Sequence, residues 1–163
     1  MQITTQLSGS RIIFYLILII IISLGLKLYT VDFSIPPHTD DLGYILDSMQ
    51  YNEGDFFLSQ KKHPGWSLVL APFMAIVNSD DFLDYGSAAR ILSITISIIT
   101  IIPMYILARR FFDEKYSLVA SSLFAFEPHL NYNSVLGLSE PIFILGVILT
   151  SIFILQKNHN WYF

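Results

Sequence analysis

An almost unbroken apolar run near the N-terminus constrains the fold more than any other feature. Residues 12–26 carry hydrocarbon or aromatic side chains, apart from one serine and one glycine. With its flanks, at residues 11–29, the run would extend roughly 27 Å as a helix, about one thickness of membrane hydrocarbon. It is long for the apolar part of a signal peptide, and no Ala-x-Ala-like cleavage site follows. The sequence therefore predicts an uncleaved membrane helix here.

The composition predicts a membrane protein for the chain as a whole. Hydrophobic residues make up 53% of it and charged residues only 13%, against about 25% charged residues in soluble domains. The net charge of −4 argues against a nucleic-acid partner, which needs a basic surface. The absence of cysteine excludes a disulfide framework and a thiol nucleophile.

Three further segments are predicted to cross the membrane. They cover residues 88–108, 116–132 and 140–156, and the second is interrupted by Glu127-Pro128. Together with 11–29 they predict an all-α membrane protein, a polytopic bundle of about four transmembrane helices within one domain, 1–163.

The basic residues predict how this bundle is oriented. Positively charged residues favour the cytoplasmic side, so an N-terminus inside the cell and an acidic first loop outside satisfy most of them. Lys61 and Lys62, in the outer loop, count against the rule. The residues placed inside by this path are Arg11, Arg109, Arg110, Lys115 and Lys157.

The predicted outer loop, residues 30–87, contains two short helices that we expect to lie along the membrane surface. Pro36-Pro37 ends any helix that continues outward. Residues 41–53 have apolar side chains at i, i+3, i+4 and i+7, typical of an amphipathic helix. Residues 66–77 would reach only about 18 Å. If 66–77 did cross the membrane, the later loops would change sides.

Asp40 and Asp41 are the main candidates for chemistry. Neighbouring carboxylates repel each other, so one holds its proton to a higher pH, which suits a general acid or base. A divalent cation that holds a phosphate is an open alternative. The structural alternative is that Asp41 caps the following helix and Asp40 is solvated.

Glu140 lies at the start of the last predicted span. An acid there either faces the dipole in the first helical turn or marks a functional site. If Ser139 or Ser134 caps the helix, Glu140 falls in the first turn.

Three basic side chains are candidate phosphate ligands. Lys62 and His63 precede Pro64, and a basic rim on an interfacial helix is the alternative interpretation. Arg90 begins the second span, where it either extends to the interface or holds a lipid phosphate. No metal-ligand spacing, glycine-rich phosphate loop or Ser-His-Asp order is present, so no metal ligand is predicted.

Taken in order, four short motifs resemble the N-terminal part of GT-C membrane glycosyltransferases, in the protein O-mannosyltransferase and aminoarabinose-transferase branch. Asp-Asp-Leu-Gly-Tyr at 40–44 matches the family's acidic motif, and Lys-His-Pro-Gly at 62–65 its Lys/His-Pro-Pro motif. Ala-Ala-Arg at 88–90 matches the opening of the second membrane helix. Glu-Pro at 140–141 matches a second acidic site.

The resemblance implies a cell-membrane enzyme that takes a sugar from a polyprenyl-phosphate donor. Asp40 would deprotonate a hydroxyl of a protein or glycolipid acceptor, which attacks the sugar in one inverting displacement. Asp41 and Glu140 would shape the acceptor side. The residues in contact with substrate would be Tyr44, Lys62, His63 and Arg90.

Differences from the family limit this expectation. Asp41 replaces the usual Glu, Gly65 replaces a Pro, and Gly43 stands where some relatives have a basic residue. Members of the family are much longer, so we expect an incomplete or split enzyme, with a second polypeptide completing the fold. The alternative is a small polytopic transporter or assembly subunit without catalysis.

Overall fold

The computed structural model describes residues 9–37, 39–56, 64–77 and 79–155, and these residues form helices without any strand. The all-helical prediction is therefore confirmed for the described part of the chain. The helices are α1 (Gly9–Thr30), α2 (Thr39–Asn52), α3 (Pro64–Val77), α4 (Phe82–Ala108), α5 (Glu114–Ala125), α6 (Pro128–Val135) and α7 (Glu140–Ile154).

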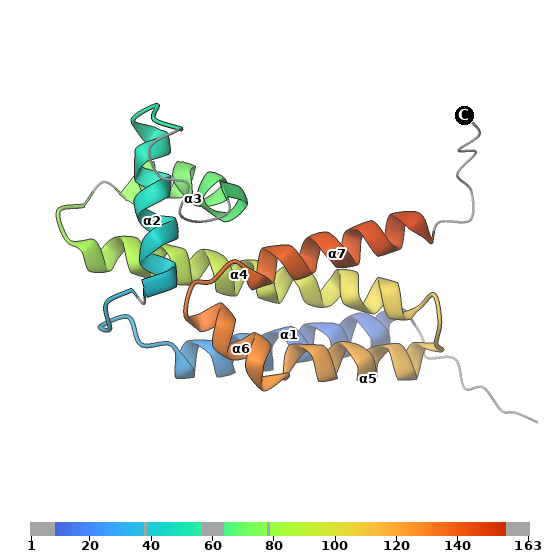
Figure 1. The fold of residues 1–163 in the computed structure, drawn as a ribbon. Helices are drawn as coiled ribbons and strands as arrows, with labels where there is room; N and C mark the ends of the chain where they lie inside the picture. Colours follow the sequence, from blue (N-terminus) through green and yellow to red (C-terminus); the bar gives the residue numbers. More distant parts are fainter. Residues whose placement is uncertain (1–8, 38, 57–63, 78, 156–163) are drawn as a thin grey trace, which may run out of the picture.

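Four of these helices form an elongated bundle around α4. Figure 1 shows α1, α4, α5 and α7 running roughly along one common axis, with successive members reversing direction. The helix α4 contacts each of the other described helices. It is also the longest, at 27 residues. The helix α4 is therefore the common packing partner of all the others, while α2 and α3 pack most closely against each other.

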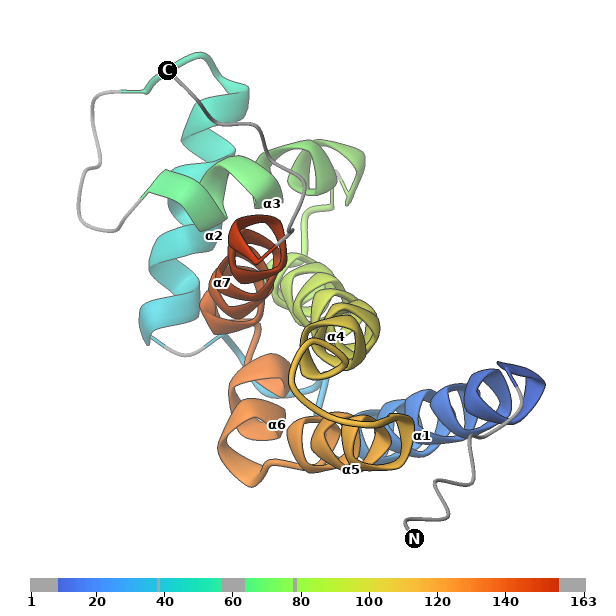
Figure 2. The same cartoon turned by 90° about the vertical axis from the view of Figure 1, so that its right-hand side faces the viewer.

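The helices α2 and α3 lie across one end of this bundle. Seen along the bundle axis in Figure 2, both run across this axis, beside the parts of α4 and α7 at this end. They occupy the two stretches predicted as short interfacial helices, and each starts two residues before the predicted boundary, at Thr39 and Pro64. Proline suits the first position of a helix, because a backbone N–H there has no acceptor within the helix and proline, which lacks this group, loses no hydrogen bond.

The third predicted span is divided into two helices. The helix α5 ends at Ala125, and α6 begins at Pro128. Glu127 caps α6, because its side chain accepts a hydrogen bond from the backbone N–H of Leu130 at 2.6 Å. The predicted interruption of segment 116–132 at Glu127-Pro128 is therefore present as a break between two helices, since Pro128 lacks the backbone N–H that would continue α5 and instead begins α6.

Two buried apolar clusters hold the assembly together. One joins α2 and α3 to α4, and the other joins α1 and α5 to α4. The members of the first are Ile45, Trp66, Leu70, Met74, Ala89 and Ile96. The members of the second are Ile19, Ile101, Leu118 and Ala125.

Two helices, α1 and α4, are long and apolar enough to cross a membrane by length and composition. The helices α3 and α7 are apolar but shorter. Along α1 only a narrow stripe is buried, formed by Ile19, Ser23 and Lys27, which are four residues apart and share one face. Most of its other large apolar side chains are exposed.

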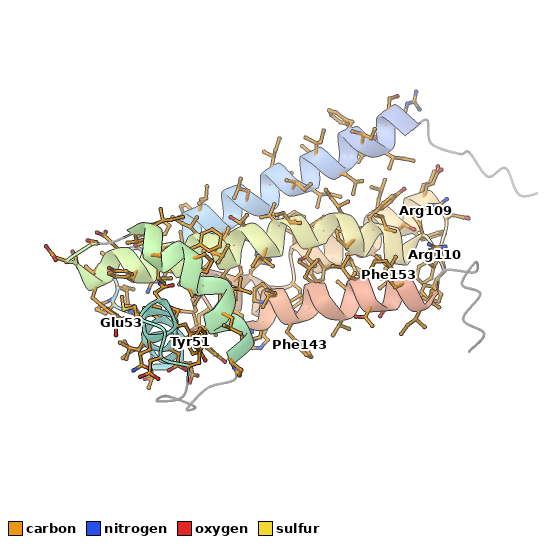
Figure 3. The ribbon with its side chains drawn as sticks, turned by 90° about the horizontal axis from the view of Figure 1, so that it is seen from above. Tyr51, Glu53, Arg109, Arg110, Phe143 and Phe153 are labelled. Atoms are coloured by element: carbon orange, nitrogen blue, oxygen red, sulfur yellow. The ribbon has the colours of Figure 1, made fainter. Side chains whose placement is uncertain are left out.

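The two ends of the bundle differ in their side chains. Figure 3 shows Arg109 and Arg110 at one end, and Tyr51 of α2 with Glu53, which follows this helix, at the other. The start of α7 lies at the α2 end as well, because the Tyr44 hydroxyl on α2 is 3.4 Å from the Ser139 hydroxyl. The predicted acidic residues therefore belong to the end opposite the arginine pair.

Candidate functional site

The first turn of α2 carries two carboxylates in opposite environments. Asp40 is exposed, whereas Asp41 has no exposed surface. The helix begins at Thr39, so Asp41 lies inside the first turn and does not precede it. Neither of its carboxylate oxygens accepts a hydrogen bond from any described residue. The interpretation of Asp41 as a helix cap is therefore wrong.

Gly137 makes room for the Asp41 carboxylate. A methyl group in place of its hydrogen would lie 3.1 and 3.3 Å from the two carboxylate oxygens, and 3.3 Å from the backbone nitrogen of Arg90. The φ angle of Gly137 is +82°, which glycine adopts without strain. Gly137 and Leu138 donate to the carbonyls of Ser134 and Asn133, the pattern that ends a helix with a left-handed glycine.

Burial changes the acid–base chemistry of Asp41. Loss of solvation raises the pKa of its carboxyl group from 3.8 to about 7, and the positive charge of Arg90 opposes part of this rise. A carboxyl group with a pKa near the working pH can both accept and release a proton. Within this pair, the perturbed acid is therefore Asp41, and the solvent-facing acid is Asp40.

The turn between α6 and α7 is the meeting point of three helices. The Trp66 indole of α3 donates to the Gly137 carbonyl at 3.0 Å, and the Ser93 hydroxyl of α4 donates to the Leu138 carbonyl at 3.2 Å. Tyr44 of α2 reaches Ser139 in the same turn. Tyr44, predicted to contact substrate, is thus half-buried and directed toward the start of α7.

Glu140 opens α7 as predicted, in its first turn. The Ser139 side chain makes no capping hydrogen bond, and the Ser134 hydroxyl instead donates to the Asn131 carbonyl. The expectation that one of these serines caps α7 through its side chain is therefore wrong.

The Glu140 carboxylate faces the interior of the bundle. Its Oε2 atom is buried and has no hydrogen-bond partner among the described residues. It borders a cavity of about 10 Å³ together with Ser97 and Thr100 of α4, about the space that one water molecule needs. Neither Asp40 nor Asp41 lines this cavity.

Arg90 is buried at the start of α4, with 3% of its surface exposed. Its guanidinium donates to the carbonyl oxygens of Asp32 at 2.7 Å, Ile35 at 2.8 Å and Pro36 at 3.4 Å. These carbonyls belong to the connection from α1 to α2. The alternative that Arg90 extends into the water interface is therefore wrong.

A cavity of about 530 Å³ opens beside Arg90, within the size range of small-molecule sites. Arg90 lines this cavity, with its guanidinium already bound to carbonyl oxygens of the α1–α2 connection. The walls are otherwise mostly apolar. They are formed by Leu26, Thr30, Asp32, Ile35, Arg90, Phe126, Pro128, Asn131, Tyr132, Val135 and Leu136.

Lys27 is a polar residue of this region that the sequence reasoning missed. It is 2% exposed, and its ammonium donates to the Asn131 amide oxygen at 2.6 Å and the Ser134 hydroxyl at 2.9 Å. In the sequence it looks like the polar end of an apolar run. The available signal was its position four residues after Ser23, on one helix face.

The remaining predicted residues cannot be placed in this site. Lys62 and His63 lie outside the described residues. Among the residues that the structure describes, no group of three or more His, Cys, Asp or Glu side chains could hold a metal ion. The described part of the predicted site therefore consists of Asp40, Asp41, Tyr44, Arg90 and Glu140, all at one end of the bundle.

Comparison of the chain with protein-family models, with curated proteins and with solved structures finds no match.

Proposed function

We propose that this chain is part of a membrane glycosyltransferase of the GT-C type. It would transfer a sugar from a polyprenyl-phosphate donor to a hydroxyl group of a protein or glycolipid acceptor. The observation that carries the proposal is the first turn of α2. There, the exposed Asp40 lies on a helix that crosses the end of an apolar bundle, beside the buried Asp41.

The position of α2 supports chemistry at a membrane surface. A lipid-linked sugar keeps its polyprenyl chain in the hydrocarbon and its phosphate and sugar at the interface. An acid on a helix lying across the end of apolar helices meets that interface directly. The proposal takes α1, α4, the α5–α6 pair and α7 as the spans, with α2 and α3 on the outer face.

In the proposed reaction, the Asp40 carboxylate removes the proton from the acceptor hydroxyl. The oxygen attacks the anomeric carbon from the face opposite the phosphate, the new C–O bond forms, and the bond from that carbon to the phosphate oxygen breaks. The configuration inverts once, and polyprenyl phosphate leaves. Asp41 carries no bond to substrate in this scheme and supports the turn that precedes Glu140.

The test compares Asp40→Asn with the unchanged protein. Membranes from cells that produce the full-length protein are incubated with polyprenyl-phosphate sugars carrying a radiolabel, and label transferred to acceptor is counted. Removal of a general base lowers the rate by about 10²–10⁴-fold. Expression and membrane insertion should be unchanged, because Asp40 is exposed and loss of one negative charge from the first turn of a helix costs only about 0.3–1 kcal/mol.

The result that contradicts the proposal is near-normal transfer by the Asp40→Asn variant, or no transfer by the unchanged protein from any of these donors. Asp41→Asn is the matched control for charge removal in the same turn, with a milder loss expected. A larger loss at Asp41 would mean that the motif is matched one residue out of register.

A small transporter without catalysis is the second candidate, and Lys27 favours it. An ionisable side chain inside an apolar helix, held by polar groups of another helix, is a common feature of transport pathways. The two candidates are separated by Lys27→Met. If the protein is a transporter, Lys27→Met should abolish transport, and neither the variant nor the unchanged protein should transfer sugar. If it is an enzyme, a correctly folded Lys27→Met variant should retain sugar transfer.

A further inference from the structure

The connection between α1 and α2 is short and carries the chain directly to the candidate acid. It runs from Val31 to Pro37 before α2 begins at Thr39. The backbone position of the first turn of α2, where Asp40 lies, is therefore defined on one side by this connection. Two residues of α4 hold it, and they lie four positions apart, on one face of the helix.

The first of these residues is Gly86. A Cβ atom at Gly86 would lie 2.7 Å from Cγ and 3.2 Å from Cδ of Pro37. The first distance is shorter than any normal contact between carbon atoms. The Pro37 ring therefore rests directly on the backbone of α4, in space that only a glycine leaves open.

The second is Arg90, one turn further along α4. Its guanidinium binds three carbonyl oxygens of the connection, those of Asp32, Ile35 and Pro36. An arginine fork suits this task, because several donors are fixed in one plane. A lysine ammonium cannot reproduce that geometry.

We propose that Gly86 and Arg90 together form a seat that fixes the α1–α2 connection and thereby positions Asp40. Arg90 is then a positioning residue and not a ligand of the donor phosphate, which is the role that the sequence resemblance implies for it. The kinetic part of this inference rests on the proposed glycosyltransferase function. The structural part does not.

The structural part is tested with a spin label on the connection. The chain has no cysteine, so Phe33→Cys provides a single labelling site at a partly exposed side chain in the middle of the connection. The label is compared in this 163-residue chain with and without Gly86→Ala or Arg90→Lys. Both substitutions should increase the mobility of the nitroxide in its electron paramagnetic resonance spectrum.

Matched substitutions elsewhere serve as controls. Gly146→Ala changes a glycine of α7 that has nothing within 4 Å of the added methyl group. Arg110→Lys changes an exposed arginine at the opposite end of the bundle. Both controls should leave the spectrum unchanged. Unchanged spectra for Gly86→Ala and Arg90→Lys would overturn the inference.

The kinetic part separates positioning from phosphate binding. Misplacement of a catalytic group by about 1 Å costs on the order of 10²-fold in rate. Both Gly86→Ala and Arg90→Lys should therefore lower kcat by about that factor, with the KM for the polyprenyl-phosphate sugar unchanged. Similar losses of kcat for Gly86→Ala and Arg90→Lys would indicate that both residues fix the same connection.

Two results would overturn this part. One is a raised donor KM for Arg90→Lys with normal kinetics for Gly86→Ala, as expected for a phosphate ligand. The other is normal kcat in variants whose connection has become mobile. An unchanged protein without any transfer activity would refute the proposed function instead, and the spin-label spectra would still decide whether the seat exists.

Discussion

Replacement of Asp41 by Asn should remove a pH dependence from the stability of the protein. Burial raises the pKa of the Asp41 carboxyl group from 3.8 to about 7 in the folded chain, while the unfolded chain keeps the ordinary value. Between these two pH values the folded state holds a proton that the unfolded state has released. The unchanged protein therefore loses stability as the pH rises from about 4 to about 7, and this loss is complete above pH 7.

The size of the effect follows from the same pKa values. One pKa unit corresponds to about 1.4 kcal/mol, so the full cost of ionising Asp41 in place is about 4 kcal/mol. Between pH 5 and pH 8 the unchanged protein should lose about 3 kcal/mol through this group. One kcal/mol corresponds to about 2–4 °C in Tm for a chain of this size. As the pH rises from 5 to 8, the Tm of Asp41→Asn should therefore gain roughly 6–12 °C relative to the Tm of the unchanged protein.

Thermal unfolding in detergent micelles, followed by tryptophan fluorescence at several pH values, measures this difference. Trp66 is a suitable reporter, because it is 3% exposed and donates to the turn that packs against Asp41. Asp40→Asn is the control, since this side chain is exposed and should leave the pH dependence in place. Parallel pH profiles for Asp41→Asn and the unchanged protein would refute the reasoning.

Two further substitutions test the packing at the same end of the bundle. Gly137→Ala should lower the free energy of unfolding by at least about 1–2 kcal/mol, the cost of a left-handed alanine, because the methyl group also crowds Asp41. Gly146→Ala is its control, and equal stability of the two variants in thermal unfolding would contradict the expectation. Lys27→Met should cost about 1–3 kcal/mol, since it leaves the buried Asn131 oxygen without its donor. Unchanged denaturant midpoints would show that the hydrogen bond contributes little.

The helices themselves were largely predictable from local sequence signals. Pro36-Pro37 marks the end of the α1 region, and the apolar spacing around Ile45 marks α2. Residues 66–77 gave α3 almost to its boundaries. The signal at Glu127-Pro128 was seen as an interruption, but its consequence, a separate helix α6, depends on Glu127 capping it. Such caps are decided by local geometry that a hydropathy pattern does not contain.

The environment of each candidate residue was not predictable from local patterns. Asp40 and Asp41 are neighbours in sequence, yet one is exposed and the other has no exposed surface. What separates them is Gly137, nearly a hundred residues later in the chain. Arg90 was predicted either to extend to the interface or to hold a phosphate, and its partners in the structure are backbone carbonyls, which no side-chain pattern reveals.

The pairing of Lys27 with Asn131 has a consequence for how the protein is made. The two residues are 104 positions apart. Among the described helices, α1 packs mainly against α4, α5 and α6. At about 5–20 residues per second of synthesis, the Lys27 ammonium waits about 5–20 s for its acceptors to emerge from the ribosome. During that interval α1 exists without the acceptors of Lys27, so these polar contacts of the first helix form only after α6 has been made.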